Sequence, residues 1–227
     1  MIIMVGGAKG GVGKSLVSIV TANMLLNDGK NPVIVETDTD NPDVLKVFKG
    51  KKHNDVDIDI VAYNIDKDKG WEGFLTTLKN SDDTGRDVVI NSAARNTATI
   101  MERGETLNAF NDVVTLWVTN DELDGIISLN QYLKVVSHRI CIIKNGYFAD
   151  EAEYSALDNS KMVQERKAQS VYFPKFTNTL RDAIYIKRMA IHELNDNFTY
   201  GEMILATSKI NKATAAIQEA IKIATKI

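Results

Sequence analysis

Short runs of apolar, mostly β-branched residues alternate along the chain with longer segments whose apolar residues recur at helical spacing. This alternation is typical of β-α-β units, which build a parallel sheet covered by helices. Most of the short runs are continuously apolar, as strands buried on both faces are. The predicted strands span residues 2–5, 33–37, 56–63, 87–91, 113–119, 139–145 and 170–173.

Helices are predicted over residues 15–28, 123–136 and 181–195, the first ending before a glycine. Residues 204–227 form an amphipathic helix, which we expect to pack on the domain because no aromatic residue anchors its apolar face to a membrane. Residues 145–169 are polar and irregular, and predict a long loop with a short helix or two. The expected fold is therefore α/β, a three-layer sandwich with a mostly parallel twisted sheet, in one domain over residues 1–227.

Composition narrows the function classes only a little. The 227 residues are 44% hydrophobic and 25% charged, which is ordinary for a globular protein. A formal net charge of −3 excludes a polycation that coats nucleic acid by charge alone, so DNA contact needs a local patch. Arg181, Lys187 and Arg188 could form one, although a solvated helix face is slightly favoured. The N-terminal run resembles neither an export signal nor a membrane span, so we expect a cytoplasmic protein.

The cysteine and histidines suggest no metal chemistry. Cys141 lies in an apolar run and is interpreted as a buried structural thiol. A single cysteine excludes a disulfide framework or a cysteine-held cluster within one chain. His53, His138 and His192 are scattered and lack metal-ligand spacing, so no zinc site is assigned.

The most informative segment is the glycine-rich stretch between the first strand and the first helix, Val-Gly-Gly-Ala-Lys-Gly-Gly-Val-Gly-Lys-Ser over residues 5–15. A phosphate group needs converging backbone N–H donors, a cation and a helix N-terminus. Lys14 can reach the β- and γ-phosphates, and the Ser15 hydroxyl is placed to ligate Mg²⁺. The alternative, a glycine turn with surface lysines, requires motif and setting both to be accidental. The loop residues predicted to bind the nucleotide are Gly10, Gly11, Val12, Gly13, Lys14, Ser15 and Leu16.

The string Lys-Gly-Gly-Val-Gly-Lys-Ser over residues 9–15 resembles the deviant Walker A motif of the ParA/MinD superfamily of P-loop ATPases, although Ala8 replaces the first glycine of the strict Walker pattern. The resemblance implies a P-loop NTPase fold, ATP or ADP with Mg²⁺ as cofactors, and a homodimer that forms on ATP binding. It also implies that Lys9 crosses the dimer interface to the partner's phosphates and acts in catalysis with Lys14.

The second predicted strand runs into an acidic turn. The superfamily has Asp-x-Asp there, and this chain has Glu36 at the first position and Asp38 at the second. We expect Asp38 to orient the attacking water and to help hold the metal, with Asp40 as a competitor at the same spacing. A solvated turn near Pro42 is the alternative.

The fourth predicted strand ends in Asn91, where relatives usually have an aspartate. An amide oxygen can hold a metal-bound water, but it adds no charge and cannot act as a base. Hydrolysis is therefore in doubt, and Asp38 is expected to supply the missing charge. Residues 95–97 follow in a position to sense the γ-phosphate, although Thr97 could equally cap a helix.

Two later positions match the superfamily's base pocket. The resemblance suggests that Asn145 reads the adenine edge and that Pro174 walls the pocket. A turn-forming asparagine before Gly146 is the alternative for Asn145.

The leading hypothesis is thus an ATP-binding, slowly or partner-stimulated hydrolysing dimeric switch. It would act in plasmid partition or stability, or in conjugative transfer, and would touch DNA directly or through a DNA-binding partner, without stable membrane insertion. A non-hydrolysing ATP-binding regulator is the second hypothesis, favoured by Asn91. A metabolic P-loop enzyme is the third: a cluster-bearing reductase needs two cysteines per chain, and no residues suggest a synthetase's second substrate pocket.

Overall fold

The computed structural model describes residues 1–7, 9–94, 96–137, 139–166 and 168–225. Its centre is a seven-stranded sheet in the order β5-β2-β6-β1-β7-β8-β9. Every pairing in this sheet is parallel, so the expected α/β fold with a mostly parallel sheet is confirmed. The strands are β1 (Ile2–Gly6), β2 (Val33–Glu36), β5 (Ile60–Ala62), β6 (Val88–Asn91), β7 (Val113–Thr119), β8 (Arg139–Asn145) and β9 (Ser170–Phe173).

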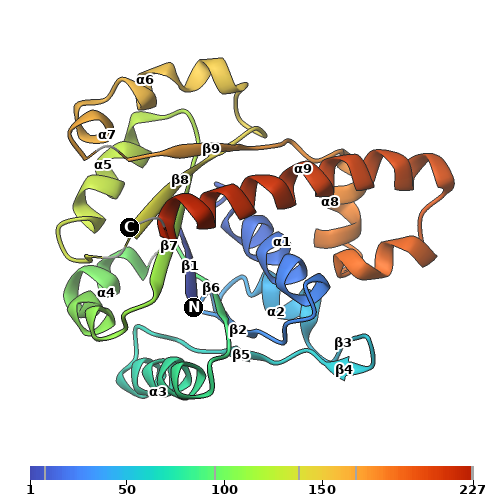
Figure 1. Cartoon of the computed structure of the whole chain (residues 1–227), viewed down its shortest axis with the longest axis horizontal. Coiled ribbons are helices and arrows are strands. Elements are labelled where there is room, and N and C mark those ends of the chain that lie inside the picture. Colours follow the sequence, from blue (N-terminus) through green and yellow to red (C-terminus); the bar gives the residue numbers. More distant parts are fainter. Residues whose placement is uncertain (8, 95, 138, 167, 226–227) are drawn as a thin grey trace.

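Helices cover both faces of the sheet and complete three layers (Figure 1). One face carries α1 (Lys14–Asn27), α2 (Asp43–Phe48), α8 (Asn178–Tyr185) and α9 (Tyr200–Thr225). The other carries α3 (Asp68–Thr84), α4 (Asn96–Arg103), α5 (Leu123–Tyr132), α6 (Ser155–Asp158) and α7 (Lys161–Arg166). The short 3-10 helices are η1 (Gly104–Ala109), η2 (Glu151–Tyr154) and η3 (Ile191–Asp196).

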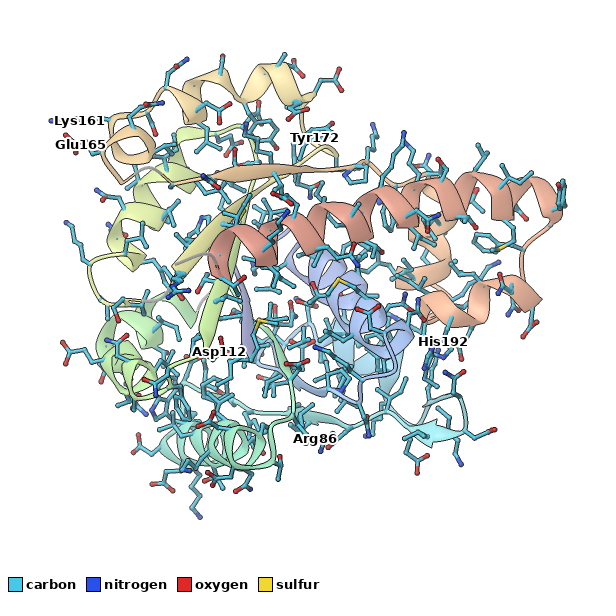
Figure 2. The ribbon with its side chains drawn as sticks, viewed as in Figure 1. Arg86, Asp112, Lys161, Glu165, Tyr172 and His192 are labelled. Atoms are coloured by element: carbon cyan, nitrogen blue, oxygen red, sulfur yellow. The ribbon has the colours of Figure 1, made fainter. Side chains whose placement is uncertain are left out.

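The two cores follow from side-chain alternation along the strands. In β1, Ile3 and Val5 enter the core under α1 and α9, while Ile2 and Met4 enter the core under α3 and α5. Both cores exclude water from the strands, which explains why the strands are apolar on both faces. Charged pairs lie on the outer surface, such as Lys161 with Glu165 on α7, 3.6 Å apart (Figure 2).

The predicted single strand at 56–63 is wrong. The chain instead forms a hairpin of β3 (Lys52–His53) and β4 (Val56–Asp57), and only then enters the main sheet as β5. Asn54 and Asp55 form the hairpin turn with φ of 49° and 64°. Asn and Asp tolerate this left-handed conformation best among non-glycine residues. Val56 and Asp57 therefore pair within the hairpin, and only Ile60–Ala62 of the predicted strand join the main sheet.

The predicted helix at 181–195 is also wrong in extent. Helix α8 ends at Tyr185, Arg188 has φ of 57°, and the chain resumes as η3. A left-handed residue cannot continue an α-helix, so the helical spacing on either side belongs to two elements. Helices α2, α3 and α4 were not predicted from the pattern.

Two other expectations are confirmed. Residues 145–169 contain only short helices. Helix α9 packs on the sheet through Ala206, Ala213, Ile217 and Ala220, next to β8 and β9; residues 226 and 227 of the predicted helix lie outside the described part. Among the described residues, no helix has the length and apolar character needed to span a membrane.

Candidate nucleotide-binding site

A pocket of about 400 Å³ opens at the carboxyl ends of the strands, beside the loop between β1 and α1. This is the edge at which open parallel sheets bind ligands, and the volume falls within the range of small-molecule sites. The predicted residues that line it are Gly10, Gly11, Gly13, Lys14, Ser15, Leu16, Asp38, Asn145 and Pro174. The structure adds Asn41, Asp43, Ser92, Tyr147, Phe176, Arg181 and Tyr185.

The loop geometry depends on Gly13. This residue has φ of 104° directly before α1, and a Cβ built on it would lie 2.3 Å from the Asn145 side-chain nitrogen. Left-handed backbone and missing space both demand glycine there. The sharp turn starts α1 at Lys14, so the first backbone N–H groups of the helix face the pocket.

Asn145 holds this loop in place. Its Nδ2 donates a hydrogen bond to the Val12 carbonyl at 2.7 Å, and its Oδ1 accepts one from the Tyr147 amide at 3.0 Å. The side chain therefore ties the end of β8 to the phosphate loop. One N–H of the amide remains for a ligand, so reading of the adenine edge stays a prediction.

Lys14 is a buried cation at the floor of the pocket. Its Nζ donates to the Lys9 carbonyl at 2.7 Å, which points the side chain back over the loop. Burial lowers the pKa of Lys14 to about 8, and the carboxylate of Asp38 opposes that shift. A buried positive charge with one carbonyl partner is poorly compensated, and an anionic ligand would compensate it.

The side chain of Lys9 points away from the pocket. It forms ion pairs with Glu122 and, at 3.1 Å, with Asp124 at the beginning of α5. The hydrogen bonds to these two carboxylates raise the pKa of Lys9. The predicted contact to a partner's phosphates therefore requires Lys9 to leave two carboxylates of its own chain.

The acidic side chain beside Asn91 is Glu36, not Asp38. Glu36 is fully buried and accepts hydrogen bonds from Asn91 Nδ2 at 2.8 Å, from the Asp38 amide at 2.9 Å and from the Val44 amide at 3.1 Å. Burial raises the pKa of Glu36 to about 7, although these hydrogen bonds oppose the shift. The longer glutamate side chain thus reaches Asn91 from the neighbouring strand, and the expectation that Asp38 supplies the missing charge stays a prediction.

Asp38 lies at the pocket, partly buried, and its Oδ1 accepts a hydrogen bond from the Asn41 amide at 3.1 Å. This contact has the form of an aspartate-stabilised turn. The turn near Pro42 that was considered as the alternative is therefore present, together with the position of Asp38 at the pocket. Asp40 is exposed and is not among the described residues that line the pocket, which favours Asp38 for the predicted water-positioning role.

The predicted base end of the pocket contains Tyr147, Phe176 and Arg181, which were not predicted as site residues, beside the predicted Pro174. The Arg181 guanidinium lies 4.3 Å from the ring centroid of Tyr147, and Lys175 Nζ lies 5.6 Å from it. Pro174 and Phe176 follow β9 and complete the wall. In the sequence, only the nearness of Tyr147 to Asn145, a predicted base-contacting residue two positions earlier, could have indicated that Tyr147 belongs to the pocket.

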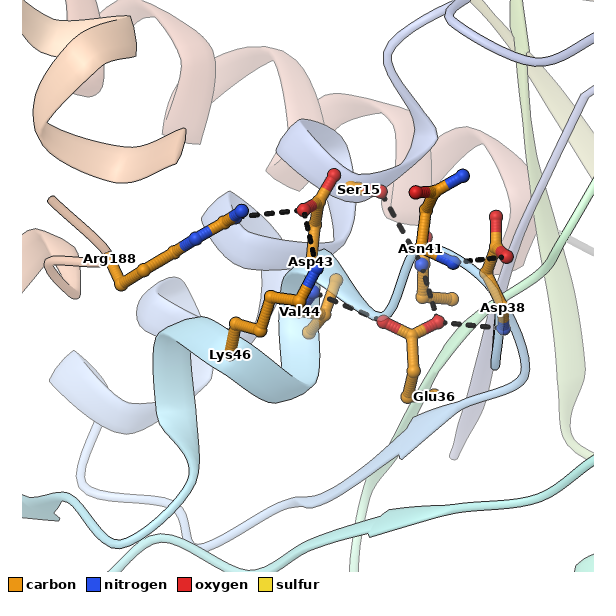
Figure 3. A network of polar contacts seen from close by, with 9 residues as sticks. Ser15, Glu36, Asp38, Asn41, Asp43, Val44, Lys46 and Arg188 are labelled. Atoms are coloured by element: carbon orange, nitrogen blue, oxygen red, sulfur yellow. Dashed lines mark hydrogen bonds and ion pairs between the residues drawn. The ribbon is translucent and has the colours of Figure 1, made fainter. Parts of the chain in front are cut away.

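This arrangement corrects the proposed basic patch. Arg181 faces Tyr147 in the pocket, and Arg188 forms an ion pair with Asp43 at 2.8 Å (Figure 3). Two of its three cations are therefore engaged within the chain, and only Lys187 of the three is fully exposed.

Other candidate groups lie away from the pocket. His53 and His192 are not scattered in space, because their ring centroids are 5.0 Å apart, while His138 lies outside the described residues. Within the part of the chain that is described, no three His, Cys, Asp or Glu residues are grouped as metal ligands would be. Arg95 and the side chains of Asn96 and Thr97 are also outside the description, so the predicted switch role there stays a prediction.

The solved structures with the same architecture are P-loop proteins. Septum site-determining protein MinD complexed with Mg-ADP from Pyrococcus horikoshii matches with a TM-score of 0.62 at 12% identity, covering 100% of this chain and 99% of that one. The MinC:MinD cell division protein complex of Aquifex aeolicus matches with a TM-score of 0.60 at 15% identity, over 96% of both chains. Apo McdA of Cyanthece also matches, with a TM-score of 0.60 at 12% identity over 97% and 98% of the chains.

Fold and phosphate loop together define a P-loop protein of the ParA/MinD type. No family model matches the sequence. Protein MobD of Acidithiobacillus ferrooxidans is 34% identical over 229 residues, which cover 97% of each chain. The chain belongs to the same family as MobD.

Proposed function

We propose that this protein binds ATP with Mg²⁺ and works as an ATP-controlled homodimeric switch that hydrolyses ATP slowly. The observation that carries the proposal is the buried cation Lys14 at the floor of a pocket formed by a glycine loop and a helix N-terminus. Oriented N–H groups, a helix dipole and a lysine favour a polyphosphate in this position. ADP is expected to occupy the same pocket.

The residues beside the loop fit a magnesium ion. Mg²⁺ prefers oxygen ligands, and the Ser15 hydroxyl and the Asp38 carboxylate both line the pocket. When bound, the ion would neutralise charge on the phosphates. Lys14 would hold the phosphates, and Asp38 would orient the attacking water, while the neutral Asn91 in the usual aspartate position accounts for slow hydrolysis.

Dimerisation would depend on whether the Lys9 ammonium group binds carboxylates of its own chain or the phosphates bound to a second copy. In the free chain Lys9 is paired with Glu122 and Asp124. A triphosphate on a second copy would compete with these carboxylates for the same ammonium group. Pairing of chains should then depend on the γ-phosphate, because more negative charge competes better.

Sedimentation velocity with Mg-ATP, Mg-ADP and a non-hydrolysable ATP analogue tests this proposal. Wild type is expected to dimerise with ATP and the analogue but not with ADP, and Lys9→Ala is expected to remain monomeric. Glu122→Gln with Asp124→Asn should dimerise at lower protein concentration, because Lys9 is released. Lys79→Ala is the matched control, since Lys79 is also an exposed lysine in an ion pair, on α3. Identical sedimentation of wild type in all three nucleotides would remove the switch proposal.

The second candidate is a regulator that binds ATP without hydrolysing it. Asn91 favours this candidate, because an amide cannot act as a base or add charge to the site. Phosphate release by wild type and by Lys14→Ala separates the two. A wild-type rate above that of Lys14→Ala supports the switch that hydrolyses ATP, and equal rates support the regulator.

We further propose that the protein is cytoplasmic in a bacterial cell and acts in plasmid partition or conjugative transfer. The relationship to MobD is in keeping with the transfer role. DNA contact through a partner DNA-binding protein is favoured over direct contact, because the net charge is −3 and Arg181 and Arg188 are engaged within the chain. Retention of the purified protein on duplex DNA at 150 mM salt, a roughly physiological ionic strength, would contradict the indirect route.

A further inference from the structure

We propose that Glu36 replaces the missing aspartate of β6 as the acidic residue that positions the metal side of the pocket, acting through Asn91 and Ser15. This inference rests on the proposed function, because it concerns how the same pocket holds Mg²⁺ with a nucleotide. β6 ends in Asn91 where relatives usually have an aspartate, and the neighbouring strand β2 ends in the carboxyl group of Glu36.

The strand register makes the exchange possible. β2 and β6 are adjacent parallel strands, and Glu36 and Asn91 are direct partners in the ladder between them. Their side chains meet at the carboxyl edge of the sheet, with Asn91 Nδ2 2.8 Å from Glu36 Oε1. One carboxylate and one amide therefore share this position, and the carboxylate comes from β2.

The hydrogen bonds around Asn91 orient it between the carboxylate and the phosphate loop. Asn91 Oδ1 accepts a hydrogen bond from the Ser18 hydroxyl at 3.1 Å, so its Nδ2 faces Glu36. The same Nδ2 lies 3.5 Å from the Ser15 hydroxyl, the predicted metal ligand. Glu36 thus acts on Ser15 through a fixed amide, as a second layer of residues around a metal does.

Glu36 also holds the connection between β2 and α2, which contributes to the pocket. It accepts hydrogen bonds from the amides of Asp38 and Val44, which fixes the turn between β2 and α2 (Figure 3). Asp38 lines the pocket within this turn, and Asp43 lines it at the beginning of α2. A carboxyl group that only stabilised the turn would need these backbone contacts alone. The additional hydrogen bond from Asn91 connects Glu36 to Ser15, the predicted metal ligand.

The test measures how strongly Mg²⁺ and nucleotide bind together, without turnover. The dissociation constant of a fluorescent ADP analogue is measured in Mg²⁺ and in EDTA for each variant, and the ratio of the two constants reports the coupling. Wild type is expected to bind more tightly with Mg²⁺. Glu36→Gln should lose about 10-fold or more of that ratio, the usual cost of removing a second-layer partner of a metal, while binding in EDTA changes little.

A charge transposition covers the case in which Glu36→Gln fails to fold. The double variant Glu36→Gln with Asn91→Asp moves the carboxylate to β6 and keeps a hydrogen bond between the two side chains. Its coupling ratio is expected to lie within about threefold of wild type, whereas Asn91→Asp alone sets two carboxyl groups in contact that should share one proton, so its ratio should also stay near that of wild type. Asp57→Asn, which removes an exposed carboxylate on the β3–β4 hairpin, is the control and should leave the ratio unchanged.

The outcomes separate the two levels of the proposal. Failure of wild type to bind the nucleotide in either buffer overturns the proposed function and this inference with it. Binding with a Mg²⁺ effect that Glu36→Gln retains, or a folded double variant without any Mg²⁺ effect, overturns the role of Glu36 and leaves nucleotide binding intact. Loss in Glu36→Gln with recovery in the double variant supports it.

Discussion

The two ends of the pocket are built in different ways. The phosphate end comes from one continuous stretch, residues 10–16, whereas the base end is assembled from residues after β8, after β9 and on α8. Backbone amides and one lysine dominate the first end, and side chains such as Tyr147 and Arg181 dominate the second. A local motif therefore specifies the predicted phosphate end, while long-range packing decides which side chains form the predicted base end.

The largest expected effect is at the phosphate end. Lys14→Ala should weaken binding of ADP by about 100-fold, because a charged hydrogen-bonding partner of the phosphates contributes about 1.5–3 kcal/mol. Isothermal titration calorimetry measures the change, with Lys79→Ala as the surface control and a thermal melt to verify folding. A loss below about threefold would show that Lys14 does not contact phosphate.

Gly13→Ala probes the joint between the two ends. The new Cβ would need a left-handed backbone and would meet the Asn145 side chain, so the free energy of unfolding should fall by about 2 kcal/mol. Gly10→Ala is the matched control, because a Cβ there meets no atom within 4 Å. Urea unfolding compares the two; equal stability of both variants would contradict the packing of Asn145 against the loop.

Tyr147→Ala tests the base end and should have a smaller effect. Loss of the ring that faces Arg181 should lower the affinity for adenine nucleotides by about fivefold, in line with about 1 kcal/mol for a cation–π or aromatic contact. The factor should be the same for AMP, ADP and ATP, whereas Lys14→Ala should spare AMP. Tyr147→Phe is expected to keep most of the affinity, and a phosphate-dependent loss in Tyr147→Ala would place the ring elsewhere.

The reactivity of Cys141 should not change when residues of the pocket are substituted. It is fully buried on β8, and burial raises its pKa to about 12, so thiolate is scarce at pH 8. Alkylation by iodoacetamide should be negligible in the native protein and in Tyr147→Ala, and complete after unfolding. The same slow alkylation rate in wild type and Tyr147→Ala would show that the substitution leaves the core around Cys141 intact. Fast labelling of native wild type would contradict the burial of β8.

The sheet was largely predictable because a parallel strand buried on both faces leaves a continuous apolar run. The run at 56–63 misled because Val56 and Asp57 pair with the preceding hairpin strand, and only Ile60–Ala62 join the main sheet. Helical spacing across 181–195 misled because an apolar pattern does not register a positive φ, which occurs at Arg188. Helix α3 was missed although its buried apolar residues Trp71, Phe74 and Leu78 have the spacing of an amphipathic helix.

By itself the sequence determined the glycine loop, the positions of most main strands along the chain and the absence of charge at Asn91, because each depends on neighbours along the chain. Only the tertiary structure decided that Glu36 faces Asn91, that Lys9 pairs with Glu122 and that Arg181 belongs to the pocket. Those contacts join residues far apart in sequence, and the strand register and the crossing of helices over the sheet bring them together.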